Sequence, residues 1–299
     1  MLYLQYILLL LQRQLSCARA CILVEILIFD MRLFIFLYCT VFSIALFAQG
    51  PISGFLPGAK TTDIALGYSF ETYDSYFFGQ DKREQMVDAT SYNLFVEHGI
   101  SSKASLVLNL PYIAIDEENS GLQDATIALK YRNQRKEYDS GNLNFITAVG
   151  LTFPISSYPK ETVNAIGAGA FQFQGRLVMQ YNWNYGTFLH IQSGFDFQLI
   201  PVARTSIPIQ VRAGMGASKF YFDVWMEYMN ALNAGVDNTV AGGEGSSWFR
   251  VGGTFYYPFT PDFGAFLGGA YVLSGENIGQ SSRINAGVVY KWNRVKKRN

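Results

Sequence analysis

Cysteine and histidine are the residue types in this sequence that most often carry nucleophilic or metal chemistry, and both are scarce. The three cysteines, Cys17, Cys21 and Cys39, lie near the N-terminus, so the rest of the chain holds no thiol. The two histidines, His98 and His190, are too far apart in the sequence to form one of the short ligand spacings that bind zinc. The sequence therefore predicts no catalytic metal, no cofactor, no thiol catalysis and no disulfide.

The charged residues are more informative, because many of them recur at alternate positions. Asp223 and Glu227 are an even number of residues apart, as are Lys130 and Arg132. In an extended strand such residues share one face. Both signs of charge occur, which favours ion pairs over the single-sign lining of an ion-selective channel. The candidates for a polar, inward, lumen-lining face are Glu71, Glu97, Asp124, Lys130, Arg132, Arg176, His190, Asp196, Arg212, Asp223, Glu227, Arg250 and Lys291.

The stretch from Gly121 to Arg132 shows most clearly the kind of element that must hold these residues. From Asp124 onwards, polar or small side chains alternate with apolar ones without interruption. This period of two is typical of a β-strand with one polar and one apolar side. The apolar side of the predicted strand carries Ala125, Ile127, Leu129 and Tyr131.

Twelve segments after residue 60 follow this pattern. No run in this part of the chain reaches the roughly 18 apolar residues of a membrane helix. An even number of antiparallel strands is usual in closed single-chain outer-membrane barrels. The sequence therefore predicts an all-β fold, a closed antiparallel up-and-down transmembrane β-barrel, with strands at about 61–78, 85–99, 104–117, 123–135, 142–155, 169–183, 187–200, 206–217, 219–231, 246–259, 262–275 and 281–294. The face of the strand at 262–275 is ambiguous, because its glycines leave neither side clearly polar.

The connections between these strands support a barrel, because short and long ones alternate as they do in outer-membrane barrels. Short connections are expected at 101–103, 184–186, 217–219 and 260–262, with one longer exception at 134–141, whereas 156–168 and 233–245 are long. Aromatic residues gather near the predicted strand ends, as an interfacial belt requires; they include Tyr73, Tyr76, Tyr131, Trp183, Tyr256, Tyr257 and Tyr290. Both termini are then expected on the periplasmic side.

The N-terminal region has a different character. Residues 31–48 combine a basic start, an apolar run and a small residue before the expected cleavage site, as a secretory signal peptide does. Residues 1–30 are interpreted as an upstream extension from a misplaced start codon, with a membrane helix as the alternative. A second alternative makes Cys39 a lipoprotein acceptor. Cleavage after the signal would leave residues 49–299 as one barrel domain.

Composition agrees with a membrane barrel. The chain is 49% hydrophobic and 16% aromatic but only 15% charged, which is too apolar for a disordered protein and poor in charge for a soluble one. The formal net charge is zero, so nothing indicates a nucleic-acid partner.

The sequence from Gly121 through Asp124 to Tyr131 resembles a motif of outer-membrane barrels of the phenol meta-pathway degradation type, often called transporters. In that family a Gly-Leu-Gly-Asp turn leads into a strand that ends in Lys-Tyr. Here Gln123 replaces the second glycine of the turn. The resemblance implies passage of small, often hydrophobic compounds across the outer membrane.

We therefore expect a non-enzymatic channel or transporter for small solutes in the outer membrane of a Gram-negative-type cell. Its expected partners are outer-membrane lipid, the barrel-assembly machinery and a solute that the sequence does not identify. One alternative is a lumen-plugged structural or adhesive barrel. Another is an outer-membrane lipid hydrolase with His190 as base, although the nearby Ser193 falls on the opposite face of the predicted strand. The third is a soluble or secreted β-sandwich.

Overall fold

The computed structural model describes residues 52–79, 81–115, 119–158, 166–167, 169–200, 203–217, 219–232 and 246–293. The predicted upstream extension and signal peptide lie outside these residues. The chain divides into two compact units, Met1–Ile44 and Ala45–Asn299, and every described residue belongs to the second. No helix in this described part is long and apolar enough to cross a membrane.

Strands make up most of the described residues. Twelve of them are long and two, β4 and β13, are short. Their bounds are β1 Thr61–Phe78, β2 Asp81–Gly99, β3 Ala104–Ala114, β4 Ser120–Leu122, β5 Asp124–Tyr138, β6 Gly141–Pro154, β7 Phe171–Trp183, β8 Thr187–Ile200, β9 Arg204–Gly216, β10 Tyr221–Ala231, β11 Ser247–Pro258, β12 Phe263–Glu276, β13 Ile278–Gly279 and β14 Ser282–Asn293.

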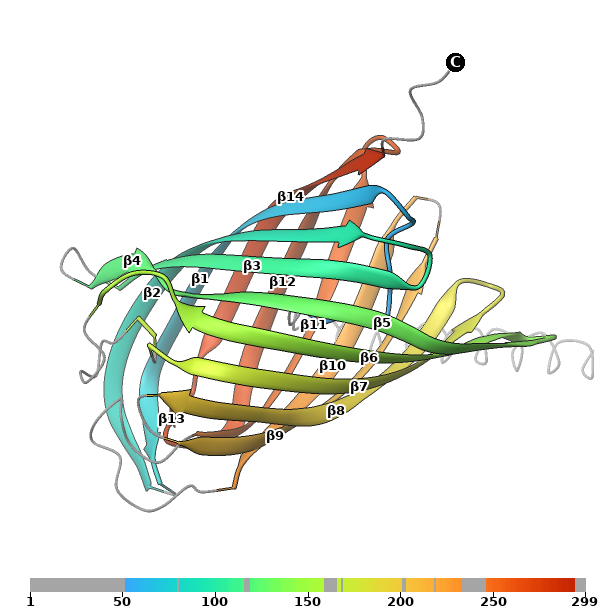
Figure 1. Cartoon of the computed structure of the whole chain (residues 1–299). Helices are drawn as coiled ribbons and strands as arrows, with labels where there is room; N and C mark the ends of the chain where they lie inside the picture. The colour runs from blue at the N-terminus through green and yellow to red at the C-terminus, as the bar shows by residue number, and fades with distance from the viewer. Residues whose placement is uncertain are drawn as a thin grey trace, which may run out of the picture. The chain divides into compact units, whose positions relative to one another are not determined.

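These strands close into a single antiparallel barrel. Each long strand pairs with the long strands before and after it in the chain, and β1 pairs with β14 from Thr61↔Asn293 to Thr72↔Ser282 (Figure 1). Closure leaves no free sheet edge, so the backbone donors and acceptors of the strands bond to one another rather than to lipid. The predicted barrel of about twelve strands is confirmed.

The two ends of the barrel differ. The connections β2–β3, β5–β6, β7–β8, β9–β10 and β11–β12 are short and lie at the end where β1 begins and β14 finishes, here called the turn end. The opposite end, here called the loop end, carries the longer connections β3–β5, β6–β7 and β10–β11. One predicted connection was wrong: β5 continues to Tyr138, which pairs with Gly141, so the β5–β6 connection is a tight turn.

The outer face of the barrel is apolar. Leu66 of β1, Leu129 of β5 and Met226 of β10 are 55%, 42% and 48% exposed, as a lipid-facing surface requires. On β12, whose faces were ambiguous, Leu267 points outward and Ala270 inward.

Two of the predicted belt residues were misplaced. Tyr73 shares the inner face of β1 with Glu71, two positions before it, and pairs in register with the buried Val87. Tyr256 shares the inner face of β11 with the buried Thr254, whereas the next residue, Tyr257, is outward and exposed. The ammonium of Lys291 lies 5.7 Å from the Tyr256 ring centroid, inside the barrel. The residue type alone does not tell which of Tyr256 and Tyr257 faces lipid. Their alternate positions along the strand do, because neighbouring residues point to opposite faces.

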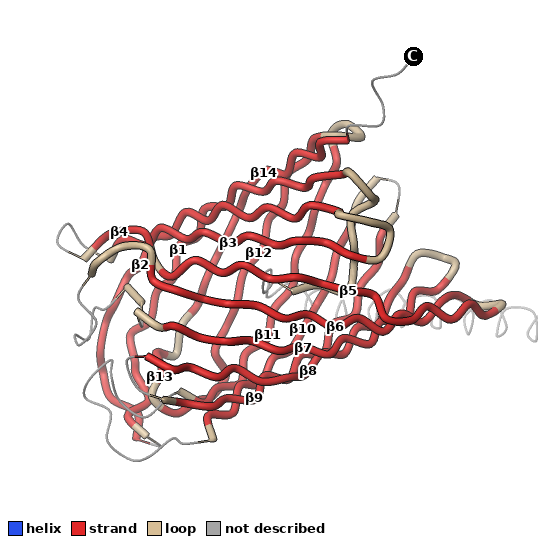
Figure 2. The backbone as a smooth tube through the Cα atoms, in the orientation of Figure 1, coloured by secondary structure: helices blue, strands red, loops and turns tan. Residues whose placement is uncertain are grey.

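Two hairpins project beyond the rim. The pairing of β3 with β5 starts at Ala104↔Tyr131, so the last residues of β5 pair with β6 alone and extend past β3 at the turn end (Figure 2). At the loop end, β2 pairs with β3 only from Thr90 onward, and its first residues pair with β1 alone.

Candidate functional site

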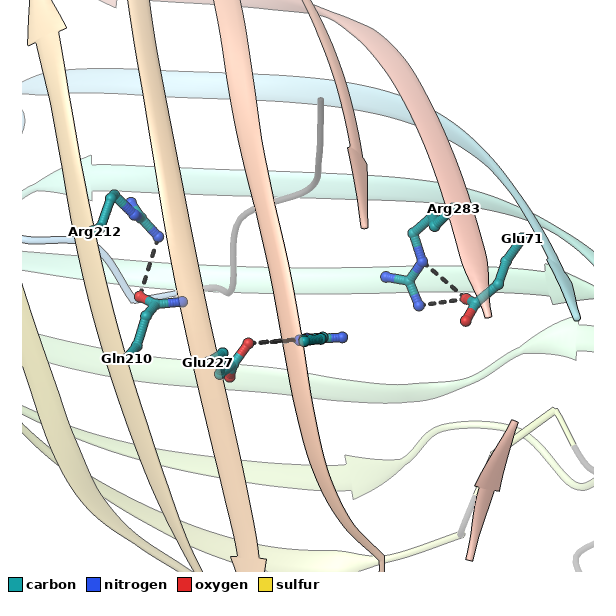
Figure 3. A network of polar contacts seen from close by, with 6 residues as sticks. Glu71, Gln210, Arg212, Glu227 and Arg283 are labelled. Carbon is teal, nitrogen blue, oxygen red and sulfur yellow. Dashed lines mark hydrogen bonds and ion pairs between the residues drawn. The ribbon is translucent and has the colours of Figure 1, made fainter. Parts of the chain in front are cut away.

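The interior of the barrel is the candidate site, because it gathers most of the charged residues that the alternation singled out. Among the described residues, five ion pairs lie on the inner wall. They are Glu97–Lys130 at 2.8 Å, Arg176–Asp196 at 2.6 Å, Arg212–Asp223 at 3.7 Å, Glu227–Arg250 at 2.8 Å and Glu71–Arg283 at 2.5 Å. Figure 3 shows Glu71 beside Arg283 on the adjacent strands β1 and β14, and Arg212 beside Gln210, two positions away on β9. Each pair joins one positive and one negative group, so the wall is close to electrically balanced.

Lys130 is fully buried and holds the densest of these clusters. Its Nζ donates to Glu97 Oε1 at 2.8 Å and to the Phe55 carbonyl oxygen at 2.6 Å, and it lies 3.3 Å from Ser53 Oγ. Glu97 Oε1 also accepts from Ser105 Oγ at 2.6 Å. An ammonium group has three donors, and here three acceptors surround it. Two of the three belong to residues that precede the first strand.

Residues 52–58, here called the strap, form that preceding segment and run inside the barrel near the turn end (Figure 1). Ile52 is buried in an apolar cluster with inner-wall residues that include Val107 and Val178. Phe55 packs edge-on against Phe188 at 5.0 Å between ring centroids. These contacts reach from β3 to β7 and β8, so the strap lies along this part of the inner wall.

Gly54 shows how closely the strap fits. A Cβ atom at this position would lie 1.9 Å from Gln180 Oε1 and 2.8 Å from His190 Nδ1. A turn then leads from the strap into β1: the Lys60 amide donates to the Gly99 carbonyl oxygen at 2.7 Å, and Lys60 has a positive φ of 65°. The strap is therefore anchored at both of its ends.

The strap was not predicted from the sequence, which assigned residues 52–60 to no element. Its signal is modest: three apolar residues, Ile52, Phe55 and Leu56, and two glycines, Gly54 and Gly58, occur shortly before the first strand. Such a segment is too short to show a periodic pattern in the sequence. Its position follows only from its contacts with barrel residues that are far from it in the sequence.

His190 and Arg212 lie beside the strap on the same inner wall. His190 Nδ1 is 3.2 Å from Gln180 Oε1, and the whole side chain is buried. Asp223 Oδ2 accepts from the Tyr221 hydroxyl at 2.6 Å as well as lying near Arg212. His190 is thus enclosed by the wall and the strap, away from the lipid face.

The ion pairs nearer the loop end are anchored to the backbone and to aromatic rings. Arg176 pairs with Asp196 and also donates to the Phe195 carbonyl oxygen at 2.8 Å. The Arg250 guanidinium donates twice to Glu227 and lies 4.2 Å from the Trp248 ring centroid. Guanidinium groups held in this way are fixed in orientation.

Three of the predicted residues lie outside the ion-paired wall. Arg132 donates to the Ser102 carbonyl oxygen at 2.7 Å at the turn end, and Lys291 lies against Tyr256. Asp124 accepts from the Tyr158 hydroxyl and from the Ala170 amide, and so ties the ends of the β6–β7 connection to the barrel. Burial and this hydrogen bond to the carboxylate raise the pKa of the Tyr158 hydroxyl well above its usual range.

Within the described residues no group of three or more His, Cys, Asp and Glu side chains is arranged to hold a metal ion. At the loop end the inner wall lines a half-open cavity of 190 Å³ between β7 and β11.

The sequence of the barrel matches a family model described as "Putative MetA-pathway of phenol degradation" over residues 50–287. The chain belongs to this family. The match includes the strap and all of the described strands except the end of β14. The resemblance carried by Gly121–Tyr131 is therefore confirmed at the level of the family. No curated protein matches the sequence.

Solved structures with a similar fold are outer-membrane barrels. The COG4313 outer membrane channel from Pseudomonas putida F1 is 14% identical, with a TM-score of 0.67 over 82% of this chain and 100% of its own. The KdgM porin is 10% identical, with a TM-score of 0.50 over 77% of this chain and 99% of its own. The NanC porin is 12% identical, with a TM-score of 0.50 over 77% and 100%. These likenesses establish the fold, which is that of an outer-membrane β-barrel.

Proposed function

We propose that this family member is a channel for small solutes across the outer membrane, with the turn end facing the periplasm. The observation that carries the proposal is the contrast between the two faces of the wall. The outer face exposes residues such as Leu129 to lipid, whereas the inner face is polar and contains the cavity at the loop end. A polar lumen inside a closed barrel is the arrangement of water-filled outer-membrane channels.

The balance of charges on the inner wall indicates weak discrimination between anions and cations. Single-sign rings of side chains select ions of the opposite sign. Here each arginine or lysine of the five ion pairs stands next to a carboxylate. We expect solutes to be sorted mainly by size and by local hydrogen bonds.

We expect the strap to form the narrowest part of the proposed pathway. It contacts β5 through Lys130 and β8 through Phe188, and so takes up space in the lumen near the turn end. A solute that enters from the loop end reaches the cavity first and the strap afterwards. Transport therefore requires either space beside the strap or its displacement.

Liposome swelling with small neutral, anionic and aromatic solutes tests the proposal, with planar-bilayer conductance as a parallel measurement. We expect slow swelling with the smallest solutes and a small single-channel conductance. Protein-free liposomes give the baseline. Absence of both swelling and conductance, in a protein that shows heat-modifiable gel mobility, contradicts a channel.

The strap also favours a second candidate function, a plugged structural barrel without transport. A variant that lacks residues 52–58 separates the two. If the complete chain conducts weakly and the shortened chain conducts strongly, the strap is a constriction of a channel. If neither conducts, the barrel is structural.

A further inference from the structure

Phe55 of the strap lies inside the barrel, and yet its apolar side chain is 41% exposed. Its ring meets two aromatic rings of the inner wall. It packs edge-on against Phe188 of β8 at 5.0 Å and against Tyr221 of β10 at 6.1 Å between ring centroids. Phe188 and Tyr221 are stacked on each other at 5.8 Å, with 11° between their planes. These two rings, here called the aromatic wall pair, therefore receive one further ring that solvent can reach.

The backbone of the same residue is held by a polar group of the wall. The Phe55 carbonyl oxygen accepts a hydrogen bond of 2.6 Å from Lys130 Nζ, and Ser53 Oγ lies 3.3 Å from that nitrogen. Glu97 pairs with Lys130 at 2.8 Å and balances its charge, so the two oxygens that the strap supplies are neutral acceptors. Phe55 thus presents a ring to the aromatic wall pair and a neutral oxygen to Lys130. A small solute that carried both groups would present the same chemistry.

The strap is held more firmly at its start than at Phe55. Ile52 is buried in the apolar cluster of the inner wall, whereas Leu56 is only partly buried against that cluster. Gly54 and Gly58 lie on either side of Phe55, and glycine adopts more backbone conformations than other residues do. The partly exposed Phe55 can therefore leave the wall while Ile52 keeps the strap inside the barrel.

We propose that the strap occupies a solute site, and that a small neutral compound with one aromatic ring and one acceptor oxygen competes with Phe55 for this site. The ring of the compound lies against Phe188 and Tyr221, and its oxygen accepts a hydrogen bond from Lys130. Both groups are needed, because a ring alone leaves the buried ammonium with one acceptor fewer, which is unfavourable. The inference rests on the proposed channel function, since the compound is taken to be a solute in the lumen. Such a solute displaces part of the strap and so widens its own path.

The reactivity of a cysteine on the strap reports whether the strap has moved. Ser53→Cys in the full chain, in neutral detergent, is treated with a charged thiosulfonate reagent, and mass spectrometry follows the peptide around residue 53. We expect para-fluoroacetophenone to accelerate the reaction several-fold and saturably. Para-fluoroethylbenzene lacks the oxygen and acetylcyclohexane lacks the aromatic ring, so both should accelerate it much less.

Ser102→Cys, at an exposed position of the turn end, is the control for this experiment. Its reaction rate should not respond to any of the three compounds. No acceleration at position 53 by para-fluoroacetophenone, or equal acceleration by all three compounds, overturns the inference.

Fluorine NMR titration with para-fluoroacetophenone measures the binding itself. Phe55→Ala removes the competing ring and should tighten binding at least about ten-fold. Phe188→Leu, added to Phe55→Ala, removes one ring of the aromatic wall pair and should weaken binding again. Tyr185→Leu is the matched control, because Tyr185 is an aromatic residue of the turn end that is 71% exposed. Equal affinity of wild type and a Phe55→Ala variant with heat-modifiable gel mobility shows that the strap does not compete, and overturns the inference.

Liposome swelling of the same preparations separates this inference from the proposed function. If neutral solutes pass but para-fluoroacetophenone neither binds nor exposes residue 53, the channel stands and the solute site is wrong. If the compound binds and exposes residue 53 but no solute passes, the site is real and the proposed channel function is wrong.

Discussion

Lys130 of β5 donates a hydrogen bond of 2.6 Å to the backbone carbonyl oxygen of Phe55, and this contact joins the barrel wall to the strap inside the barrel. The same ammonium group is paired with Glu97. A single buried side chain therefore links the charge balance of the wall to the position of the strap. Loss of the Lys130 contact should therefore change the conductance of the proposed channel.

Lys130→Met should increase single-channel conductance, because the strap loses a charged hydrogen bond. The variant also leaves the carboxylate of Glu97 buried without its partner, which typically costs about 3–5 kcal/mol of folding free energy. The double variant Glu97→Gln with Lys130→Met removes that charge, so it should recover much of the stability and still conduct more than wild type. Planar-bilayer recordings and urea titration of the heat-modifiable band measure the two effects. A conductance equal to that of wild type in both variants would show that Lys130 does not hold the strap.

Ser53→Cys provides a direct report on the strap, because the cysteines of the sequence all precede residue 40. Ser53 Oγ lies 3.3 Å from Lys130 Nζ inside the barrel, so a thiol at this position should react slowly with a charged thiosulfonate reagent. The reaction should become faster when Lys130→Met is added. Ser102→Cys, at an exposed position of the turn end, is the fast-reacting control. Equal rates at positions 53 and 102 in the otherwise unchanged protein would place the strap outside the lumen.

Arg176→Gln should destabilise the barrel more than Arg135→Gln. Arg176 and Asp196 are nearly buried, with side-chain exposures of 10% and 8%, so loss of the arginine leaves a buried carboxylate and costs about 3–5 kcal/mol. The Arg135–Glu137 pair is exposed, and such pairs contribute about 0–1 kcal/mol. Urea unfolding in micelles, followed by heat-modifiable mobility, compares the two variants. Similar midpoints for both would mean that water reaches the Arg176 pair freely.

The strands and their faces could be predicted from the sequence because both depend on local alternation. The pattern of Asp124–Tyr131 needs only the period of a strand and the difference between water and lipid. The predicted bounds of β1 and β8 agree with the structure. Among the strands of the described residues, the two short ones, β4 and β13, were missed because they have too few residues to show a period.

The partners of the charged residues could not be predicted in the same way, because they depend on how strands are staggered. Glu71 and Arg283 are direct register partners across the seam that closes the barrel, although 212 positions separate them in the sequence. Arg176 instead reaches Asp196 diagonally, since its direct partner is Gly194. Alternation fixes the face of a side chain, whereas stagger and tilt determine which charge it meets.

Glu227→Gln tests whether these pairs set the ion preference of the proposed channel. Glu227 lies directly opposite Arg250 and accepts both of its hydrogen bonds, so the neutral amide leaves one positive charge on the inner wall. The reversal potential in a potassium chloride gradient should therefore shift towards that of chloride. Glu137→Gln removes a carboxylate from the exposed β5–β6 hairpin and should leave the reversal potential unchanged. If the two variants shift it equally, surface charge and not the inner wall governs selectivity, and the balanced wall has no role in ion preference.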